Sequence, residues 1–299
     1  MRNREEVSLR FMELQESICF ALENADGKAT FHEDLWDRAE GGGGRTRVIQ
    51  NGNIIEKGGV NFSAVHGPTP EKIQKALGLP TSNFYATGVS IVLHPYNPFV
   101  PIIHMNIRYF EISDGTYWFG GGIDLTPHYV EDEDARYFHQ TLKEVCDRYD
   151  KSYYPHFSKW ADDYFYLKHR KETRGIGGIF FDRLTENESA TFSQLWEFVQ
   201  SVGETFTPIY THYMSKNGKK PYSDEHTKWQ SIRRGRYVEF NLVWDKGTKF
   251  GLDTDGRTES ILMSMPPVAQ WNYDYQTLPN SPEQKTLNKL VKGINWISK

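Results

Sequence analysis

The stretch IIHMNIRYFEI, residues Ile102–Ile112, decides the fold. Apolar and polar residues alternate through its centre, which is typical of a half-buried β-strand. Because alternate residues of a strand share a face, His104, Asn106 and Arg108 are predicted to project together, while the apolar residues between them face the opposite way. A strand with one face in solvent shows the same pattern, so the alternation alone leaves open whether the polar face is a functional site.

Two further strands are predicted on either side of this stretch, at Gly88–His94 and Tyr117–Leu125. The connections are short and rich in Pro, Asn, Asp and Gly, which indicates antiparallel pairing because parallel crossovers need longer connections. In the second of these strands Asp124 shares its predicted face with Gly120 and Gly122. The two glycines leave room for a flat ligand on the sheet or, equally, for a helix packed against it.

Outside these strands the sequence shows mainly helical patterns. An amphipathic N-terminal helix ends near Asn24, and further helices are expected at Glu131–Cys146, Tyr154–His169, Ser189–Met214, with a bend near Pro208, and Ser223–Arg233. A hairpin of strands around Asp245-Lys246-Gly247, and one more strand after it, are expected at Arg236–Trp244, Thr248–Leu252 and Thr258–Met265. With no linker or internal repeat, the expected fold is a single α+β domain over residues 1–299, a large antiparallel β-sheet covered by α-helices on both sides.

Composition and charge exclude several classes of function. The chain of 299 residues has a formal net charge of −4 and no long basic run, so nothing indicates nucleic-acid binding. No apolar stretch is long enough to span a membrane. Cys19 and Cys146 match no redox or zinc motif, which favours a reducing, cytoplasmic setting. Aromatic residues form 14% of the chain, which suits a pocket for a planar ligand, although an ordinary aromatic-rich core explains this composition more simply.

Arginine is the residue best suited to hold a carboxylate, because its planar guanidinium can donate to both oxygens. Arg108 and Arg257 are the first candidates for such a role. Arg257 follows Asp255-Gly256 at a predicted turn, although a lone Gly-Arg pair is more often a surface turn than a binding site.

Four dispersed histidines raise the question of a metal site. None has the close spacing of a known ligand motif. A position at the edge of the core explains His139 more simply, and a position near a helix C-terminus explains His169. The four histidines are His94, His104, His139 and His169.

Several long runs, in order along the chain, resemble the oxygen-dependent coproporphyrinogen III oxidase family. The most specific are GGGIDLTP at Gly120–Pro127, RGIGGIFFD at Arg174–Asp182 and the segment Tyr237–Pro267. The resemblance spans nearly the whole chain, because it also includes Trp36 with Gly41–Arg47, Gly59–Ser63 and Asp162–His169.

The resemblance implies a homodimeric cytoplasmic oxidoreductase of haem and porphyrin biosynthesis, which acts on CH–CH groups with oxygen as acceptor. Such an enzyme decarboxylates the A- and B-ring propionates of coproporphyrinogen III to vinyl groups, giving protoporphyrinogen IX, with dioxygen as co-substrate and without flavin or nicotinamide. By motif position, His104 matches the proton donor and Asp124 the carboxylate that faces the pyrrole nitrogens. Bacterial relatives often have Gly at the position of Asp255. The substrate-binding positions match Ser90, Asn106, Ile107, Arg108, Asp255, Gly256 and Arg257.

The resemblance further implies a divalent cation and a dimer interface. Bacterial members are credited with a cation at four histidines, and residues 236–267 match the dimerisation region. Proton donation by His104 conflicts with metal binding unless its two ring nitrogens divide the tasks. Two other classes of function stay open: a non-catalytic tetrapyrrole-binding carrier or regulator, and a metal-dependent hydrolase, for which the sequence lacks a carboxylate–histidine motif. The matching histidines are His94, His104, His139 and His169.

Overall fold

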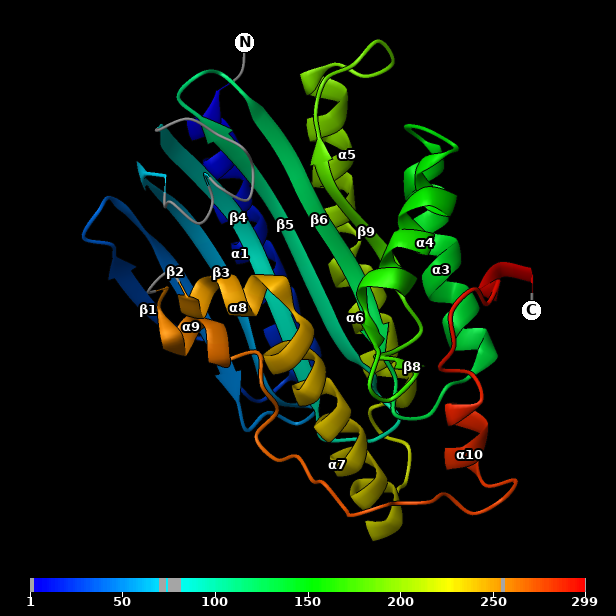
Figure 1. Cartoon of the computed structure of the whole chain (residues 1–299). Coiled ribbons are helices and arrows are strands. Elements are labelled where there is room, and N and C mark those ends of the chain that lie inside the picture. Colours follow the sequence, from blue (N-terminus) through cyan, green and yellow to red (C-terminus); the bar gives the residue numbers. More distant parts are fainter. Residues whose placement is uncertain (1–2, 70–73, 75–81, 254–255, 299) are drawn as a thin grey trace.

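A seven-stranded antiparallel sheet runs through the centre of the molecule (Figure 1). The computed structural model describes residues 3–69, 74, 82–253 and 256–298. The strand order is β1-β2-β3-β4-β5-β6-β9, so six strands follow one another as a meander and β9 joins its free edge later in the chain. The three central strands that the sequence predicts are confirmed. The strands are β1 (His32–Asp37), β2 (Gly42–Gln50), β3 (Ile55–Pro68), β4 (Asn83–Pro95), β5 (Ile102–Ile112), β6 (Tyr117–Thr126) and β9 (Gly178–Leu184).

One face of the sheet carries the main hydrophobic core. Along β5, Ile103, Met105 and Ile107 are fully buried on this face, as the alternation predicts. Helix α1 (Arg4–Asp26) packs on β3 and β4 and ends at Gly27, whose φ of 71° closes the helix in the left-handed region. The other helices here are α3 (Asp132–Asp147), α5 (Phe192–Glu204) and α6 (Phe206–Asn217), with α4 (Tyr153–Tyr164) along the edge formed by β9.

The opposite face of the sheet is covered in part by a second group of helices. Figure 1 shows α7 over one end of the sheet, with α8 and α9 extending from it towards β1. Ser260 fixes α9 to the sheet, because its hydroxyl lies 2.7 Å from the Thr46 hydroxyl and its carbonyl accepts from Asn61 Nδ2 at 2.7 Å. Helices therefore cover both sides, as predicted. This group consists of α7 (Asp224–Glu239), a π-helical turn (Phe240–Trp244), α8 (Lys246–Asp253) and α9 (Thr258–Leu262).

The predicted hairpin at Arg236–Trp244 and Thr248–Leu252 is wrong, because both segments are helical. Asp245 does not begin a two-residue turn. Its carboxylate accepts the backbone N–H of Thr248 at 2.6 Å, which is the hydrogen bond of a helix N-cap. Of the apolar residues that suggested a strand, Tyr237 packs against two residues of β4 and β5, Phe240 joins a separate buried cluster, and Leu242 and Val243 are exposed.

Three other boundaries differ from the prediction. The segment Thr258–Met265 forms α9 and a loop, since it lies on the face of the sheet, where it has no strand edge to pair with. The predicted helix Ser189–Met214 is divided into α5 and α6, and Pro208 lies in the first turn of α6, where its missing N–H breaks no helical bond. The helix expected at Tyr154–His169 ends at Tyr164.

Candidate active site

The in-register pairing of the strands arranges the partly covered face into rows of side chains. One row crosses four strands through Asn61, Ser90, Asn106 and Gly122. Neighbouring strands lie about 4.8 Å apart, so such a row is a strip roughly 14 Å long. The rows on either side of it are Ser63, Gly88, Arg108 and Gly120, and Gly59, Val92, His104 and Asp124. Apart from Ile107, the candidate residues of β4, β5 and β6 therefore share one face.

Asp124 is a deeply buried polar group of this face. It is 1% exposed, and its two carboxylate oxygens both accept from Arg174 Nη2 at 2.7 Å. One of these oxygens also accepts from His104 Nδ1 at 2.7 Å. Burial alone would raise the pKa of Asp124, but the guanidinium and the imidazole outweigh it and hold the pKa below its ordinary value. Asp124 is therefore an ionised carboxylate.

Arg174 is the functional residue that the sequence analysis missed. It lies in the loop before β9, 3% exposed, with its Nη1 donating to Asn241 Oδ1 at 2.8 Å. Its guanidinium carbon lies 4.3 Å from the ring centre of Phe165 and 4.7 Å from those of Tyr237 and Phe240. Three aromatic faces thus stabilise a cation that has been removed from water. The only signal in the sequence is its place at the start of the RGIGGIFFD run.

The ion pair fixes the orientation of His104. Because ionised Asp124 can only accept, the proton on the bonded nitrogen belongs to His104 Nδ1. Among the described residues Nε2 has no hydrogen-bond partner, and the side chain is 23% exposed. A carboxylate that fixes one nitrogen of an imidazole leaves the other available for proton transfer. His104 is thus positioned as a general acid or base.

Asp124 itself has little open surface. In this conformation its oxygens contact Arg174 and His104, and a direct contact with pyrrole N–H groups would need the covering residues to move. The geometry supports a role of Asp124 through His104 more directly than a role on the substrate.

The expected substrate-binding residues of β4 and β5 lie next to one another. Ser90 pairs with Asn106 across the two strands, and Asn106 Oδ1 accepts from Arg108 Nη1 at 2.9 Å. All three are half-buried. Ile107 differs, because its side chain belongs to the core on the other face and cannot reach a ligand on this one.

Arg257 lies at the far end of the same face. It forms an ion pair with Asp34 on β1, the edge strand, and both side chains are 36% exposed. The backbone N–H of Gly256 donates to the carbonyl of Gly251 at 2.8 Å, while Asp255 lies outside the described residues. From β1 to β5, which carries Arg108, there are four strand steps, or roughly 19 Å. The two arginines are therefore placed to hold opposite parts of a wide ligand.

Two of the four histidines are core residues. His139 lies behind the sheet on α3, with its ring nitrogens 2.9 Å from the Tyr154 hydroxyl and 2.9 Å from the Ile176 carbonyl. Burial lowers its pKa to about 4. His94 Nε2 lies 2.8 Å from the carbonyl of Ser264, and burial and then nearby positive charge lower its pKa well below the ordinary value.

The other two histidines do not complete a metal site. His169 has Nε2 at 2.6 Å from Glu239 and Nδ1 accepting from the Trp244 indole N–H at 2.9 Å, and His104 is bound to Asp124. In the described part of the chain no group of three or more His, Cys, Asp or Glu side chains is arranged to hold a metal ion. The cation implied by the resemblance does not fit these residues, and we assign no chemical step to it.

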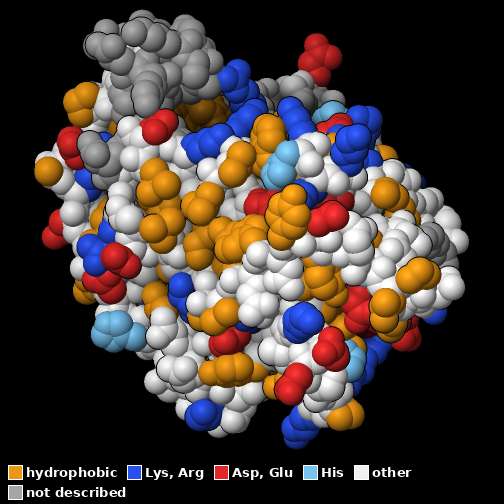
Figure 2. All heavy atoms as spheres, turned by 60° about the horizontal axis from the view of Figure 1, so that its bottom comes forward, with side chains coloured by type: hydrophobic (Ala, Val, Ile, Leu, Met, Phe, Trp, Pro, Cys, Tyr) orange, Lys and Arg blue, Asp and Glu red, His pale blue; other side chains and the backbone are white. Residues whose placement is uncertain are grey.

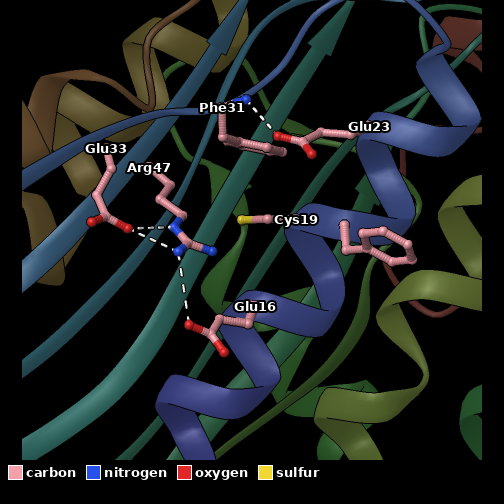
Figure 3. Close-up of a pocket in the computed structure, with 7 residues that line it drawn as sticks. Glu16, Cys19, Glu23, Phe31, Glu33 and Arg47 are labelled. Carbon is pink, nitrogen blue, oxygen red and sulfur yellow. Dashed lines mark hydrogen bonds and ion pairs between the residues drawn. The ribbon is translucent and has the colours of Figure 1, made fainter.

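A cavity of about 300 Å³ opens on the other face of the sheet, between α1, β1 and β2 (Figure 3). Arg47 projects into it and lies 2.8 Å from Glu33 and 3.8 Å from Glu16, with Glu23 also in the wall. Burial raises the pKa of the Cys19 thiol in this wall to about 12, so the thiol is uncharged. Three carboxylates around one guanidinium would repel an anionic substrate, and we place no substrate here.

Breaking the Asp124–Arg174 pair should destabilise the protein, because the partner left behind is a buried unpaired group. Asp124→Asn or Arg174→Gln alone is expected to lower the free energy of unfolding by about 3–5 kcal/mol. The double variant should lose roughly 1–3 kcal/mol less than the sum, since no charge is then left unpaired. Urea unfolding followed by tryptophan fluorescence measures all three, and strictly additive losses would contradict the pairing.

The same pair gives the stability a defined pH dependence. The folded pKa of Asp124 is below its ordinary value, so its contribution is fully present above the unfolded pKa and is lost as pH falls through the folded pKa. Between about pH 5 and pH 2 the native protein should lose more stability than the double variant.

Comparisons with known proteins identify the family. The family model described as coproporphyrinogen III oxidase matches residues 6–296. A protein of Glycine max described as an oxygen-dependent coproporphyrinogen-III oxidase, chloroplastic, is 46% identical over 300 residues, covering 95% of this chain and 77% of that protein. A Nicotiana tabacum protein with the same description is 46% identical over 302 residues, covering 95% of this chain and 75% of its own length. The chain belongs to the coproporphyrinogen III oxidase family.

Proposed function

We propose that this protein is an oxygen-dependent coproporphyrinogen III oxidase, which converts the A- and B-ring propionates of coproporphyrinogen III to vinyl groups and forms protoporphyrinogen IX. The observation that carries the proposal is the position of His104. Asp124 holds one of its ring nitrogens, and the imidazole lies one row from Ser90 and Asn106 on the half-buried face of the sheet. An acid–base group thus borders a surface that suits a flat ligand.

The overall reaction explains why a proton donor is needed. Each catalytic cycle converts one propionate, one dioxygen and one proton into a vinyl group, carbon dioxide and hydrogen peroxide. A C–H bond on the propionate β-carbon and the bond to the carboxylate carbon break, and the two electrons released reduce dioxygen. His104 is the proton donor that we assign to this balance. The reduced tetrapyrrole is itself electron-rich, so the proposed chemistry uses dioxygen without flavin or nicotinamide.

Two arginines on the same face provide for the anionic side chains of the substrate. Arg108 on β5 and Arg257 at the start of α9 each keep about a third of the side chain exposed. A guanidinium can bind a carboxylate with both prongs, which orients a ligand as well as attracting it. We propose that they hold propionates at opposite sides of the macrocycle.

Product analysis separates this proposal from a carrier or regulator. The purified protein is incubated with coproporphyrinogen III in air and, in parallel, without oxygen, and the porphyrins are separated after oxidation. We expect protoporphyrin only in air, with release of carbon dioxide. Tight binding of the substrate without any vinyl product would favour the carrier instead.

The role of His104 can be tested with a substitution that keeps its structural bond. In His104→Asn the side-chain amide lies near the position of Nδ1 and can still donate to Asp124, but an amide is not a titratable group that can supply the proton. We expect kcat to fall about 10²- to 10⁴-fold with an unchanged unfolding midpoint. Near-normal kcat in the folded variant would exclude His104 as the proton donor.

Arg257→Ala should mainly weaken substrate binding. Loss of a charge-assisted contact to a propionate costs about 1.5–3 kcal/mol, or roughly 10- to 150-fold in affinity. Lysine should restore only part of it, because the forked geometry is lost. Asp34→Asn is the matched control, since it breaks the same ion pair but keeps the guanidinium. Unchanged affinity in the alanine variant would make Arg257 an ordinary surface residue.

We also propose a homodimer to which residues 236–267 contribute. The described part of the segment is largely helical, and its exposed apolar side chains support the interface. Figure 2 shows hydrophobic side chains gathered near the middle of one face of the molecule between charged ones. Within or just beyond the segment, the exposed ones are Leu242, Val243, Leu252, Val268 and Trp271.

Sedimentation velocity at micromolar concentration tests the dimer. We expect a dimer for the native chain and a shift towards monomer for Leu242→Asp with Val243→Asp, because charge would be buried at the interface. Phe20→Asp is the control, as Phe20 is 69% exposed on α1, outside the proposed interface. A native monomer, or an equal shift in the control, would contradict this interface.

The location in the cell belongs to the proposal as well. None of the described helices has the length and apolar character needed to cross a membrane. Both relatives are described as chloroplastic. We propose a cytoplasmic setting, which rests on the use of cysteine in the sequence.

We also propose that residues 1–299 form one domain, which rests on the continuous sequence pattern.

A further inference from the structure

Arg108 is held by a carboxylate that the sequence analysis did not single out. Its Nη2 donates to Asp182 Oδ1 at 2.8 Å, and its Nη1 donates to Asn106 Oδ1 at 2.9 Å. The side chains of the ion pair are 36% exposed for Arg108 and 33% for Asp182. The pair is thus accessible to a ligand lying on this face of the sheet.

A local irregularity of the sheet begins next to Asp182. Strand β9 has one residue more than β6 where Phe119–Gly121 pairs with Phe181–Leu184, which makes a β-bulge. Arg183, in the bulge, has a φ of 52°, a conformation that residues with a side chain rarely adopt. Asp182 directly follows Phe181, which is still in regular register with β6, and its carboxylate accepts from Arg108 of β5 over Gly120.

Gly120 provides the space for the pair. A methyl group at Gly120 would lie 2.6 Å from Asp182 Oδ1 and 2.8 Å from Arg108 Nη2. Any other residue would therefore force the two side chains apart. Gly120 was expected to leave room for a flat ligand or a packed helix. In the structure it leaves room for an ion pair.

The geometry of arginine makes this pair a competitor of the substrate. A guanidinium binds a carboxylate with two prongs through Nη2 together with either Nη1 or Nε. Both arrangements use Nη2, where Asp182 already accepts from one of the two N–H groups. An arriving carboxylate therefore meets a like charge at the atom that it needs, and a partly exposed ion pair is weak enough to be exchanged.

We propose that Asp182 is a positioning and specificity-determining residue, which holds Arg108 over Gly120 in the empty site and is displaced from Nη2 by a carboxylate of the substrate. The inference rests on the proposed binding of a propionate by Arg108. While Asp182 neutralises Arg108, a flat ligand without a carboxylate gains nothing there. Only a ligand that brings its own negative charge to this end of the sheet replaces the contact.

Binding can be measured without turnover by using coproporphyrin III, the oxidised and fluorescent tetracarboxylate, as the probe. Asp182→Asn keeps an oxygen acceptor for Arg108 but removes the competing charge, so the Kd should fall about three- to ten-fold. The gain should shrink as the salt concentration is raised. Asp182→Glu keeps the charge, and its Kd should stay within about two-fold of the native value.

A double-variant cycle shows whether Asp182 acts through Arg108. In an Arg108→Ala background, Asp182→Asn should change the Kd by less than about two-fold. Glu13→Gln is the matched control, because it removes one negative charge from an exposed ion pair on α1, on the other face of the sheet. With coproporphyrinogen III, Asp182→Asn should lower KM while kcat changes less than about three-fold.

Unchanged or weaker binding by the folded Asp182→Asn protein would overturn the proposal, and so would the same gain in the Arg108→Ala background or in Glu13→Gln. Tighter binding by Asp182→Glu would also contradict it. The Kd values of the variants for coproporphyrin III are measured without turnover, so they do not depend on the proposed activity. A native protein that makes no product refutes the proposed function, yet the probe still decides whether Asp182 competes for Arg108.

Discussion

The buried ion pair between Asp124 and Arg174 is the interaction on which the rest of the site depends. Both side chains are 2% exposed, so the loss of hydration is large and must be offset by geometry. The offset comes from two contacts to one carboxylate, from Asn241, and from three aromatic rings around the guanidinium. These partners lie on β6, after α4, on α7 and in the π-helical turn. The pair therefore connects the sheet to its cover, and the orientation of His104 follows from it.

The π-helical turn after α7 completes this arrangement. A π-helical turn shifts the phase of a helix by adding a residue, and such turns occur frequently at functional sites. In this turn Phe240 stacks on Arg174 while Asn241 accepts its hydrogen bond, and Tyr237, one turn earlier, contacts the same guanidinium. Tyr237, Phe240 and Asn241 are spaced three and four residues apart, so they lie on one face of the helix where α7 runs into this turn. One short segment thus supplies three contacts to one buried cation.

The sequence allowed the central strands and the shared face of His104, Asn106 and Arg108 to be predicted, because a period of two residues is a local property. Arg174 was not predictable in the same way, since its partner Asp124 is 50 residues away and only the packed structure brings them together. The hairpin failed because Asp245 followed by Gly247 is compatible with a tight turn and with a helix N-cap, and tertiary contacts decided for the helix. Strand β9 was hidden in a glycine-rich run, where the local signal for a strand is weak.

Burial distinguishes the ion pairs of this face by what they can do. The pair beneath His104 is almost fully enclosed, so neither partner can leave without exposing a charge to a poorly solvated interior, and it acts as permanent structure. The pairs of Arg108 with Asp182 and of Arg257 with Asp34 keep about a third of each side chain in solvent, where water replaces a lost partner at little cost. The same chemistry thus serves two purposes. The enclosed ion pair fixes an acid–base group. The ion pairs at the exposed ends of the face leave two guanidinium groups available to exchange their partners for the carboxylates of a large anionic ligand.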